Sequence, residues 1–404
     1  MERYSEYKDS GAKWLGKIPK HWDVIKAKYL WNEVFSFSEN GSENLLSVSQ
    51  YDGVTQAKNE SRSESLKGYK KVAKDNLVIN IMLAWMGGLG VSEYNGIVSP
   101  AYCVYRLKKA ANPKFMHYLY KTPMYLAEFA RHSTGVIPSR WRMYTDDFGQ
   151  VLTLIPPIDE QDKIVSYLDK VTSKIDEAIA QQQKMIDLLN ERKQIIINNA
   201  VTKGLNPDAP MKDSGIDWIG EIPEHWEQKR LRFLCNIKTG DKDTIDREDN
   251  GKYPFYVRSP KIEHINSFSF DGEAVLMAGD GVGAGKVFHY VKGKFGCHQR
   301  VYIIYNFKNV EGEYLYYYMQ IKFKHIIEQY SAKSTVDSVR LFMLQNFNIL
   351  IPSTQEQNNI ISHIKNATVR IDKVISFQQR MLALLQERKQ IIINDVVTGK
   401  VKVS

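Results

Sequence analysis

The sequence predicts an α+β protein with two mixed α/β globules, each followed by a long helix. The first observation behind this is an internal repeat within the 404 residues: the motif W-[LI]-G-x-I-P-x-H-W begins at Trp14 and recurs 204 positions later at Trp218. The second is a helical segment, residues 191–198, that recurs 196 positions later as residues 387–394. Between the repeated segments the two halves differ. We therefore expect one duplicated frame that carries two different binding surfaces.

The two globules come first in each half. Short β-rich runs bounded by turn residues predict strands at 77–82, 102–106, 274–277, 286–291 and 300–305. Helical stretches are expected near 113–130 and 311–329. His21 and His225 lie in the repeated motif without a nucleophilic or acidic partner nearby in the sequence, and this favours structural roles. The predicted domain boundaries are 1–156, 157–204, 205–352 and 353–404.

The two helices, at 157–204 and 353–404, carry apolar residues at alternating steps of four and three, which is the pattern of a coiled coil. The predicted seam of the first helix is Ile164, Leu168, Val171, Ile175, Ala178, Gln182, Met185, Leu189, Arg192 and Ile196, and adding 196 gives the seam of the second. Gln182 and Gln378 place one polar group in each seam, where it penalises slipped registers. We expect the helices to pack on each other; the alternative is that each packs only on its own globule.

Composition points to a polyanion as the partner. The net charge is +9, and the two helical segments contribute only about +1 of it, so the globules carry about +8. The three cysteines form no C-x-x-C pair, and we expect neither a metal site nor a disulfide framework. No apolar run approaches the length of a membrane span, and no signal peptide is visible, so a cytoplasmic protein is expected.

Candidate nucleic-acid contacts lie in glycine-rich loops and in clusters of basic and aromatic residues. The loop 279–286 lacks the spacing of a phosphate-binding P-loop or of a dinucleotide fingerprint, which argues against nucleotide binding. Glycines still let main-chain N–H groups approach phosphate, and arginine can bind guanine with two hydrogen bonds. The predicted DNA-binding residues are Gly87, Gly88, Arg140, Arg142, Tyr256, Arg258, Lys261, Lys286, Lys333 and Arg340. Tight turns and solvated surface charges are the alternatives.

Motifs for chemistry are missing from the sequence. It contains no Asn-Pro-Pro-aromatic tetrad of an amino-methyltransferase, no S-adenosylmethionine loop, no nuclease core and no helicase motif. We therefore predict no catalytic residues and no cofactor in this chain.

Taken together, the W-[LI]-G-x-I-P-x-H-W openings, the I-P-x-x-x-E-Q helix starts at Ile155 and Ile351, the L-L-x-E-R-K-Q helix bodies and the two-fold repetition resemble the specificity (S) subunits of type I restriction-modification enzymes. The resemblance covers essentially the whole chain. It implies two target recognition domains that each read half of a bipartite sequence in double-stranded DNA. It also implies that the two helices form an antiparallel coiled coil with pseudo-two-fold symmetry.

The resemblance further implies partners: two methyltransferase (M) subunits and restriction (R) subunits, which would use S-adenosylmethionine, ATP and Mg. Two other classes compete with this interpretation. One is a coiled-coil adaptor whose basic globules bind RNA or another polyanion, and the other is a DNA-modifying enzyme, which the missing motifs argue against.

Overall fold

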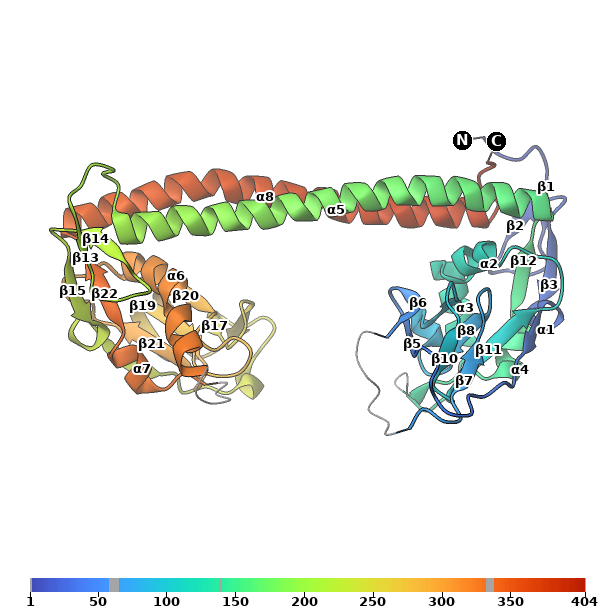
Figure 1. Cartoon of the computed structure of the whole chain (residues 1–404), viewed down its shortest axis with the longest axis horizontal. Coiled ribbons are helices and arrows are strands. Elements are labelled where there is room, and N and C mark those ends of the chain that lie inside the picture. Colours follow the sequence, from blue (N-terminus) through green and yellow to red (C-terminus); the bar gives the residue numbers. More distant parts are fainter. Residues whose placement is uncertain (1, 58–64, 138–139, 332–337, 404) are drawn as a thin grey trace. The chain divides into compact units, whose positions relative to one another are not determined.

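The computed structural model describes residues 2–57, 65–137, 140–331 and 338–403. The chain forms two compact units. The first consists of residues 1–182 and 380–404, and the second of residues 183–379. Each unit contains one globule together with one segment of each long helix, α5 (Ile158–Lys203) and α8 (Thr354–Val397) (Figure 1). The predicted mixed α/β globules and long helices are confirmed.

The globule of the first unit is built around a four-stranded sheet with the order β4-β11-β8-β9. Its elements are β1 (Tyr7–Asp9), β2 (Lys17–Pro19), β3 (Asp23–Lys26), α1 (Ala27–Leu30), β4 (Trp31–Glu33), β5 (Leu46–Ser49), β6 (Gly53–Gln56), β7 (Lys70–Val72), β8 (Leu77–Asn80), η1 (Ala84–Met86), β9 (Leu89–Val91), β10 (Gly96–Val98), β11 (Tyr102–Leu107), α2 (Pro113–Tyr120), α3 (Pro123–Arg131), α4 (Thr145–Gln150) and β12 (Leu152–Ile155). The single helix expected near 113–130 is two helices. Thr122 caps the start of α3 and Pro123 is its first residue, so the helix is interrupted between α2 and α3.

The globule of the second unit is built around a six-stranded sheet with the order β16-β21-β19-β20-β17-β18, in which only β17 and β20 are parallel. Its elements are β13 (Met211–Asp213), β14 (Glu221–Pro223), β15 (Glu227–Arg230), η3 (Leu231–Phe233), β16 (Asn236–Thr239), η4 (Thr244–Asp246), β17 (Tyr253–Tyr256), β18 (Ile262–Ile265), β19 (Phe270–Ala278), β20 (Phe288–Cys297), β21 (Val301–Tyr305), α6 (Gly312–Ser331), α7 (Leu341–Gln345) and β22 (Asn348–Ile351).

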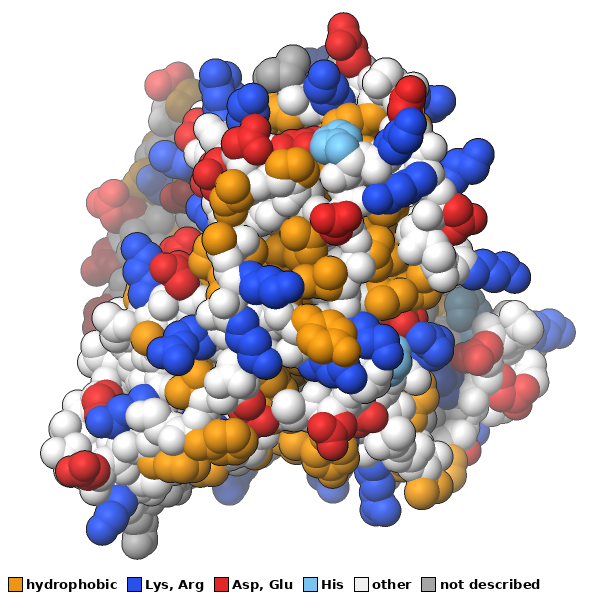
Figure 2. Space-filling model, turned by 90° about the vertical axis from the view of Figure 1, so that its right-hand side faces the viewer, with side chains coloured by type: hydrophobic (Ala, Val, Ile, Leu, Met, Phe, Trp, Pro, Cys, Tyr) orange, Lys and Arg blue, Asp and Glu red, His pale blue; other side chains and the backbone are white. Residues whose placement is uncertain are grey.

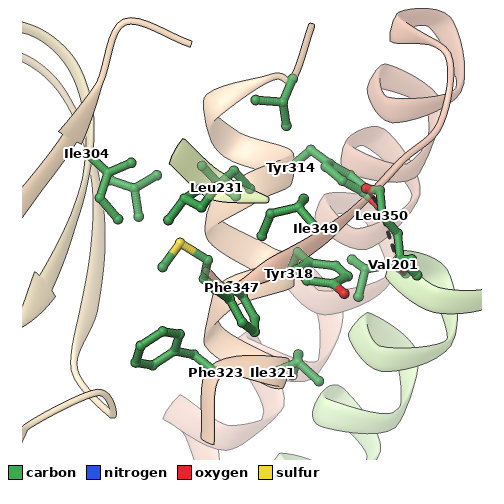
Figure 3. Packing of buried hydrophobic residues seen from close by; sticks show 14 of the residues in the cluster. Val201, Leu231, Ile304, Tyr314, Tyr318, Ile321, Phe323, Phe347, Ile349 and Leu350 are labelled. Carbon is green, nitrogen blue, oxygen red and sulfur yellow. Dashed lines mark hydrogen bonds between the residues drawn. The ribbon is translucent and has the colours of Figure 1, made fainter. Parts of the chain in front are cut away.

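The core of the second unit joins the sheet, α6 and the long helices. Tyr314 and Tyr318 of α6 are fully buried between Ile304 of the sheet and Val201 of α5 (Figure 3). The Tyr314 hydroxyl lies 3.1 Å from the carbonyl oxygen of Leu350 and 3.4 Å from that of Val201. These contacts satisfy a buried hydroxyl group and tie α6 to β22 and to the end of α5.

The repeated motifs form the same frame in both units. In each, the strand that follows the His-Trp pair runs antiparallel to the last strand of the globule, β3 with β12 in the first unit and β15 with β22 in the second. Two residues separate that last strand from the start of the long helix in each case. The two ends of each globule are therefore held side by side, whatever sequence lies between them.

A clasp of two side chains fixes each helix to its globule. Gln161 is buried, donates to the Pro156 carbonyl at 2.8 Å and accepts from the Asn112 N–H at 2.8 Å. The neighbouring Glu160 pairs with His21 at 2.7 Å. These contacts explain why the Glu-Gln and His-Trp motifs repeat together.

The second unit has the same clasp. Gln357 is buried, donates to the Pro352 carbonyl at 2.9 Å and accepts from the Glu311 N–H at 2.7 Å. Glu356 pairs with His225 at 3.0 Å and accepts from the Trp226 indole N–H at 3.1 Å. The structural role expected for both histidines is thereby confirmed.

The long helices pack on each other in antiparallel fashion within each unit. In the first unit the start of α5, with Ile164, shares a core with the end of α8, with Val397. In the second unit the end of α5, with Val201, shares a core with the start of α8, with Ile360. The ion pairs Lys389–Asp176 in the first unit and Lys193–Asp372 in the second, both at 2.7 Å, are equivalent under the repeat. The alternative, helices packed only on globules, is wrong.

Most of the predicted seam is confirmed, but two of its ten positions in α5 are off by one residue. Positions 168, 175, 182, 189 and 196 are buried or half-buried as expected, whereas Met185 is 47% exposed and Arg192 is exposed. Ile186 and the stem of Lys193 occupy those places instead. In α8 the shift from arginine to lysine recurs at Arg388 and Lys389, and a further shift places Ile375 inside and Val374 outside. The long stem of lysine covers apolar surface while its charge reaches the partner helix.

We predict that replacing Glu356 with Ala destabilises the second unit by about 1–3 kcal/mol, because the buried Trp226 N–H loses its acceptor. Glu356→Gln keeps an acceptor at the same place and is the matched control. Hydrogen exchange of the β22 amides reports the local free energy of unfolding. Equal losses in both variants would show that the carboxylate charge, rather than the hydrogen bond, matters.

Gln182 and Gln378 are half-buried in the observed seam. We predict that replacing both with Leu keeps or raises the melting temperature, because apolar burial increases, while the helix register becomes less strictly defined. Thermal unfolding followed by circular dichroism measures this. A melting temperature lowered by several degrees would contradict it.

Candidate nucleic-acid interface

Four loop segments of the second unit meet at one place, which we call the four-loop cluster. They are residues 256–259 at the end of β17, 279–287 between β19 and β20, 298–300 between β20 and β21, and 338–340 before α7. The His298 N–H donates to the Tyr256 carbonyl at 3.0 Å, the Gly279 N–H to the Arg300 carbonyl at 2.8 Å, and the Val339 N–H to the Gly279 carbonyl at 2.7 Å. Main-chain bonds thus hold the cluster together.

An aspartate flanked by two arginines lies in this cluster. The Arg258 Nη1 donates to Asp280 Oδ1 at 3.1 Å, and the Arg300 Nε lies 3.7 Å from Asp280 Oδ2. The side chains of Arg258 and Arg300 are 47% and 66% exposed, whereas that of Asp280 is 25% exposed. The three charges sum to +1, and both guanidinium groups remain open to solvent.

A glycine makes the close packing of these loops possible. A Cβ on Gly283 would lie 2.2 Å from the Arg258 carbonyl oxygen, a distance that no side chain can accept. The loop 279–287 therefore rests directly on the main chain of Arg258. Gly279, Gly283 and Gly285 thus serve close approach within the protein, and Val282 at the tip of the loop is 97% exposed.

His298 supports the cluster from within. It is buried, and its Nδ1 accepts from the Arg300 N–H at 3.0 Å. Burial lowers the pKa of His298, and the nearby charge of Arg258 lowers this pKa further. The imidazole is consequently neutral near pH 7 and acts as an acceptor that fixes the Arg300 main chain.

The structure places the predicted DNA-binding residues of the second unit in different environments. Arg258 lies in the cluster, and Lys286 and Arg340 are exposed on two of its segments. Tyr256 is a correction: it is 8% exposed, its ring packs on Phe295 and His289, and burial raises its pKa, so it belongs to the core. Lys261 is exposed and pairs with Glu263 at 3.0 Å on β18. Lys333 lies outside the described residues.

Arg300 is the residue that sequence reasoning missed. It stood at the first position of a predicted strand and was interpreted as part of it. In the structure β21 begins at Val301, and Arg300 lies in the turn before it. The available signal was the cluster His298-Gln299-Arg300, three polar residues at the junction of two apolar runs.

The first unit joins the corresponding segments differently. The Met143 N–H donates to the Ile81 carbonyl at 3.0 Å, so the loop after β8 meets the segment before α4. The rings of Trp85 and Trp141 cross at 5.4 Å between these segments. Arg140 is exposed, whereas Arg142 is half-buried and its Nη1 donates to the Trp141 carbonyl at 2.9 Å. Arg140 is thus the more accessible of the two predicted arginines.

Gly87 and Gly88 are buried, and their N–H groups donate to Ala84 and Leu83 within the loop. The Gly87 carbonyl accepts from Lys121 Nζ at 2.9 Å. With their amides already bonded, these glycines favour the tight-turn alternative over phosphate binding.

The surface around the first-unit loops mixes apolar and basic groups. Met82, Leu83, Met86, Ile137 and Tyr144 are between 36% and 54% exposed. On the face of the first unit shown in Figure 2, Lys and Arg side chains are spread among apolar and acidic ones without forming a single charged field. Such a surface offers both apolar contacts and cations to a nucleic acid.

Other sites are not evident in the part of the chain that the structure describes. Within it, no group of three or more His, Cys, Asp or Glu side chains is placed to hold a metal ion. No helix among those residues is long and apolar enough to cross a membrane.

The sequence is similar to a family of DNA specificity domains and to two specificity subunits of type I restriction enzymes. Residues 223–375 match the family model of the type I restriction modification DNA specificity domain. The chain is 26% identical over 181 residues to the specificity subunit of the type I restriction enzyme EcoDI of Escherichia coli, which covers 45% of this chain and 40% of that protein. It is 23% identical over 377 residues to the MjaVIII specificity subunit of Methanocaldococcus jannaschii, 83% of each chain.

A solved structure also matches. It concerns complex assembly and conformational transition of the type I R-M system, and one of its chains superimposes with a TM-score of 0.66 at 15% identity. The match covers 95% of this chain and 99% of that one. At this identity the likeness shows the fold alone.

Proposed function

Because the chain belongs to the family of type I restriction-modification specificity subunits, we propose that it binds double-stranded DNA in a sequence-specific way and that each unit reads one half of a bipartite target. The observation that carries this proposal is the four-loop cluster, where two exposed guanidinium groups converge on a surface fixed by main-chain bonds. Arginine is the side chain that most often reads a base edge.

The two units present different side chains for the recognition of DNA bases. The second unit presents Arg258 and Arg300, whereas the corresponding loops of the first unit present Arg140 beside the Trp85–Trp141 pair. Different side chains in one frame are suited to two unlike half-sites. Base contacts would supply specificity, while lysines on the globules supply salt-dependent affinity for the phosphate backbone.

We further propose that two methyltransferase subunits and restriction subunits assemble on this chain. S-adenosylmethionine, ATP and Mg would be used by those partners, and the present chain would contribute recognition without catalysis. The competing function, an adaptor that binds RNA, differs in its ligand and can be separated by experiment.

The test is methylation mapping. We expect cells that express the chain with its cognate methyltransferase subunits to carry methylation at one bipartite motif, and cells without the chain to lack it. The purified assembly should bind a duplex with that motif more tightly than an RNA of equal length. Methylation that is independent of the chain, or a preference for RNA, would refute the proposal.

A second prediction concerns the frame. Replacing residues 27–151, which lie between β3 and β12, with the equivalent segment of a related specificity subunit should change one half of the motif only. The exchange retains β3, β12, the Gln161–Pro156 hydrogen bond and the His21–Glu160 pair, and the new segment supplies the main-chain N–H that takes the place of Asn112. Methylation mapping of the exchanged strain shows the outcome. A change in both half-sites would mean that the units do not read independently.

A further inference from the structure

We propose that Arg300 reads a guanine in the half-site bound by the second unit and that Asp280 is the residue that positions it. The inference rests on the proposed function and adds to it the base and the reading side chain. Three observations carry it: the atom through which Arg300 faces Asp280, the presence of a carboxylate on the predicted DNA surface, and the rigidity of both main chains.

The orientation of the guanidinium group is the first observation. Arg300 faces Asp280 through Nε, at 3.7 Å. A guanidinium group is planar, so a carboxylate on the Nε side leaves the edge with both Nη atoms available. That edge can donate two parallel hydrogen bonds to O6 and N7 of guanine in the major groove. The side chain is 66% exposed, which leaves this edge accessible.

The carboxylate is the second observation. A surface that only binds phosphate gains nothing from Asp280, because its negative charge repels the DNA backbone. Here Asp280 is contacted by Arg258 on one oxygen and by Arg300 on the other. The hydrogen bond to Arg258 fixes the position of the carboxylate, and the charge of Asp280 favours the Arg300 rotamer that faces it. A guanidinium group held in one rotamer loses less conformational entropy when it binds a base.

Rigidity is the third observation. The Arg300 carbonyl accepts from the Gly279 N–H at 2.8 Å, and the Arg300 N–H donates to His298 at 3.0 Å. Asp280 directly follows Gly279 and forms a β-bridge with Ser338. The main chains that carry the aspartate and the arginine are therefore bonded to each other, which fixes the distance between their side chains. Arg258 holds the second oxygen of Asp280 at 3.1 Å and completes the support.

The experiment uses the assembled methyltransferase with four variants. Arg300→Lys keeps the positive charge but loses the two parallel N–H donors of the guanidinium group. Asp280→Ala removes the carboxylate that positions Arg300, and Asp280→Asn keeps one oxygen as an acceptor. Lys261→Ala is the matched control, because it removes an exposed cation that pairs with Glu263 outside the cluster. For each variant, methylation is mapped genome-wide and binding is measured on duplexes that carry each base at every position of the second half-site.

We expect Arg300→Lys to reduce discrimination by about tenfold to a hundredfold at one G·C pair of one half-site, with the other half-site unchanged. Asp280→Ala should relax the same position and Asp280→Asn should restore part of the preference. Lys261→Ala should weaken binding to all sequences alike and leave the motif intact. The unchanged half-site also shows that the variants fold and assemble.

Two results would overturn the inference while the proposed function stands. One is a wild-type motif that Arg300→Lys leaves unchanged at every position. The other is relaxation by Asp280→Ala at a position different from that of Arg300→Lys. If the wild-type assembly itself methylates no bipartite motif, the proposed function fails, and the inference fails with it.

Discussion

The buried glutamine at the start of each long helix is the contact on which the rest of the structure depends. Gln161 and Gln357 lie where a globule ends and a helix begins, a place where main-chain polar groups must be buried without a regular partner. Each amide satisfies a proline carbonyl on one side and a loop N–H of the globule on the other. The direction in which the helix leaves its globule is thereby set by two hydrogen bonds inside the core, where water cannot compete for them. The loop clusters are positioned relative to the helices through this junction.

Much of the fold could be predicted from sequence because the repeat displays it twice. The Trp and His-Trp motifs, the Glu-Gln helix starts and the helix bodies recur at fixed offsets, and a feature that recurs in an otherwise divergent chain belongs to the frame. The repeat does not predict which residues of the coiled-coil seam are buried. Met185 and Ile186 are both apolar, and only the antiparallel partner decides which one is covered; the choice of Lys193 over Arg192 depends on Asp372 of that partner. The pattern within one helix contains neither piece of information.

The candidate site was less predictable because it too depends on contacts between segments that are far apart in the sequence. Arg258, Asp280 and Arg300 come from three segments of the chain, and the pairing of β17, β19, β20 and β21 in one sheet brings them together. Clusters of basic residues in the sequence located Arg258 and included Tyr256, which is buried in the core together with the neighbouring Phe255. Gly87 and Gly88 resemble a phosphate-binding loop in composition, but their amides are already used by the turn. Local composition identifies groups that can bind DNA, whereas pairing across strands decides which of them are available.

The antiparallel pairing of α5 with α8 makes the two units unequal during synthesis. The second unit is one continuous stretch, residues 183–379, and all of it is synthesised before residues 380–404. The first unit needs Ile393 and Val397 to cover Ile164 and Leu168, more than 200 positions earlier in the chain. Because the N-terminal part of a nascent chain normally folds first, the order is reversed here: the second unit can complete its core while the first still exposes an apolar strip on α5. Until residues 380–404 have been made and have left the ribosome, that strip is a site for chaperones or for mispairing with another nascent chain, and those 25 residues close it.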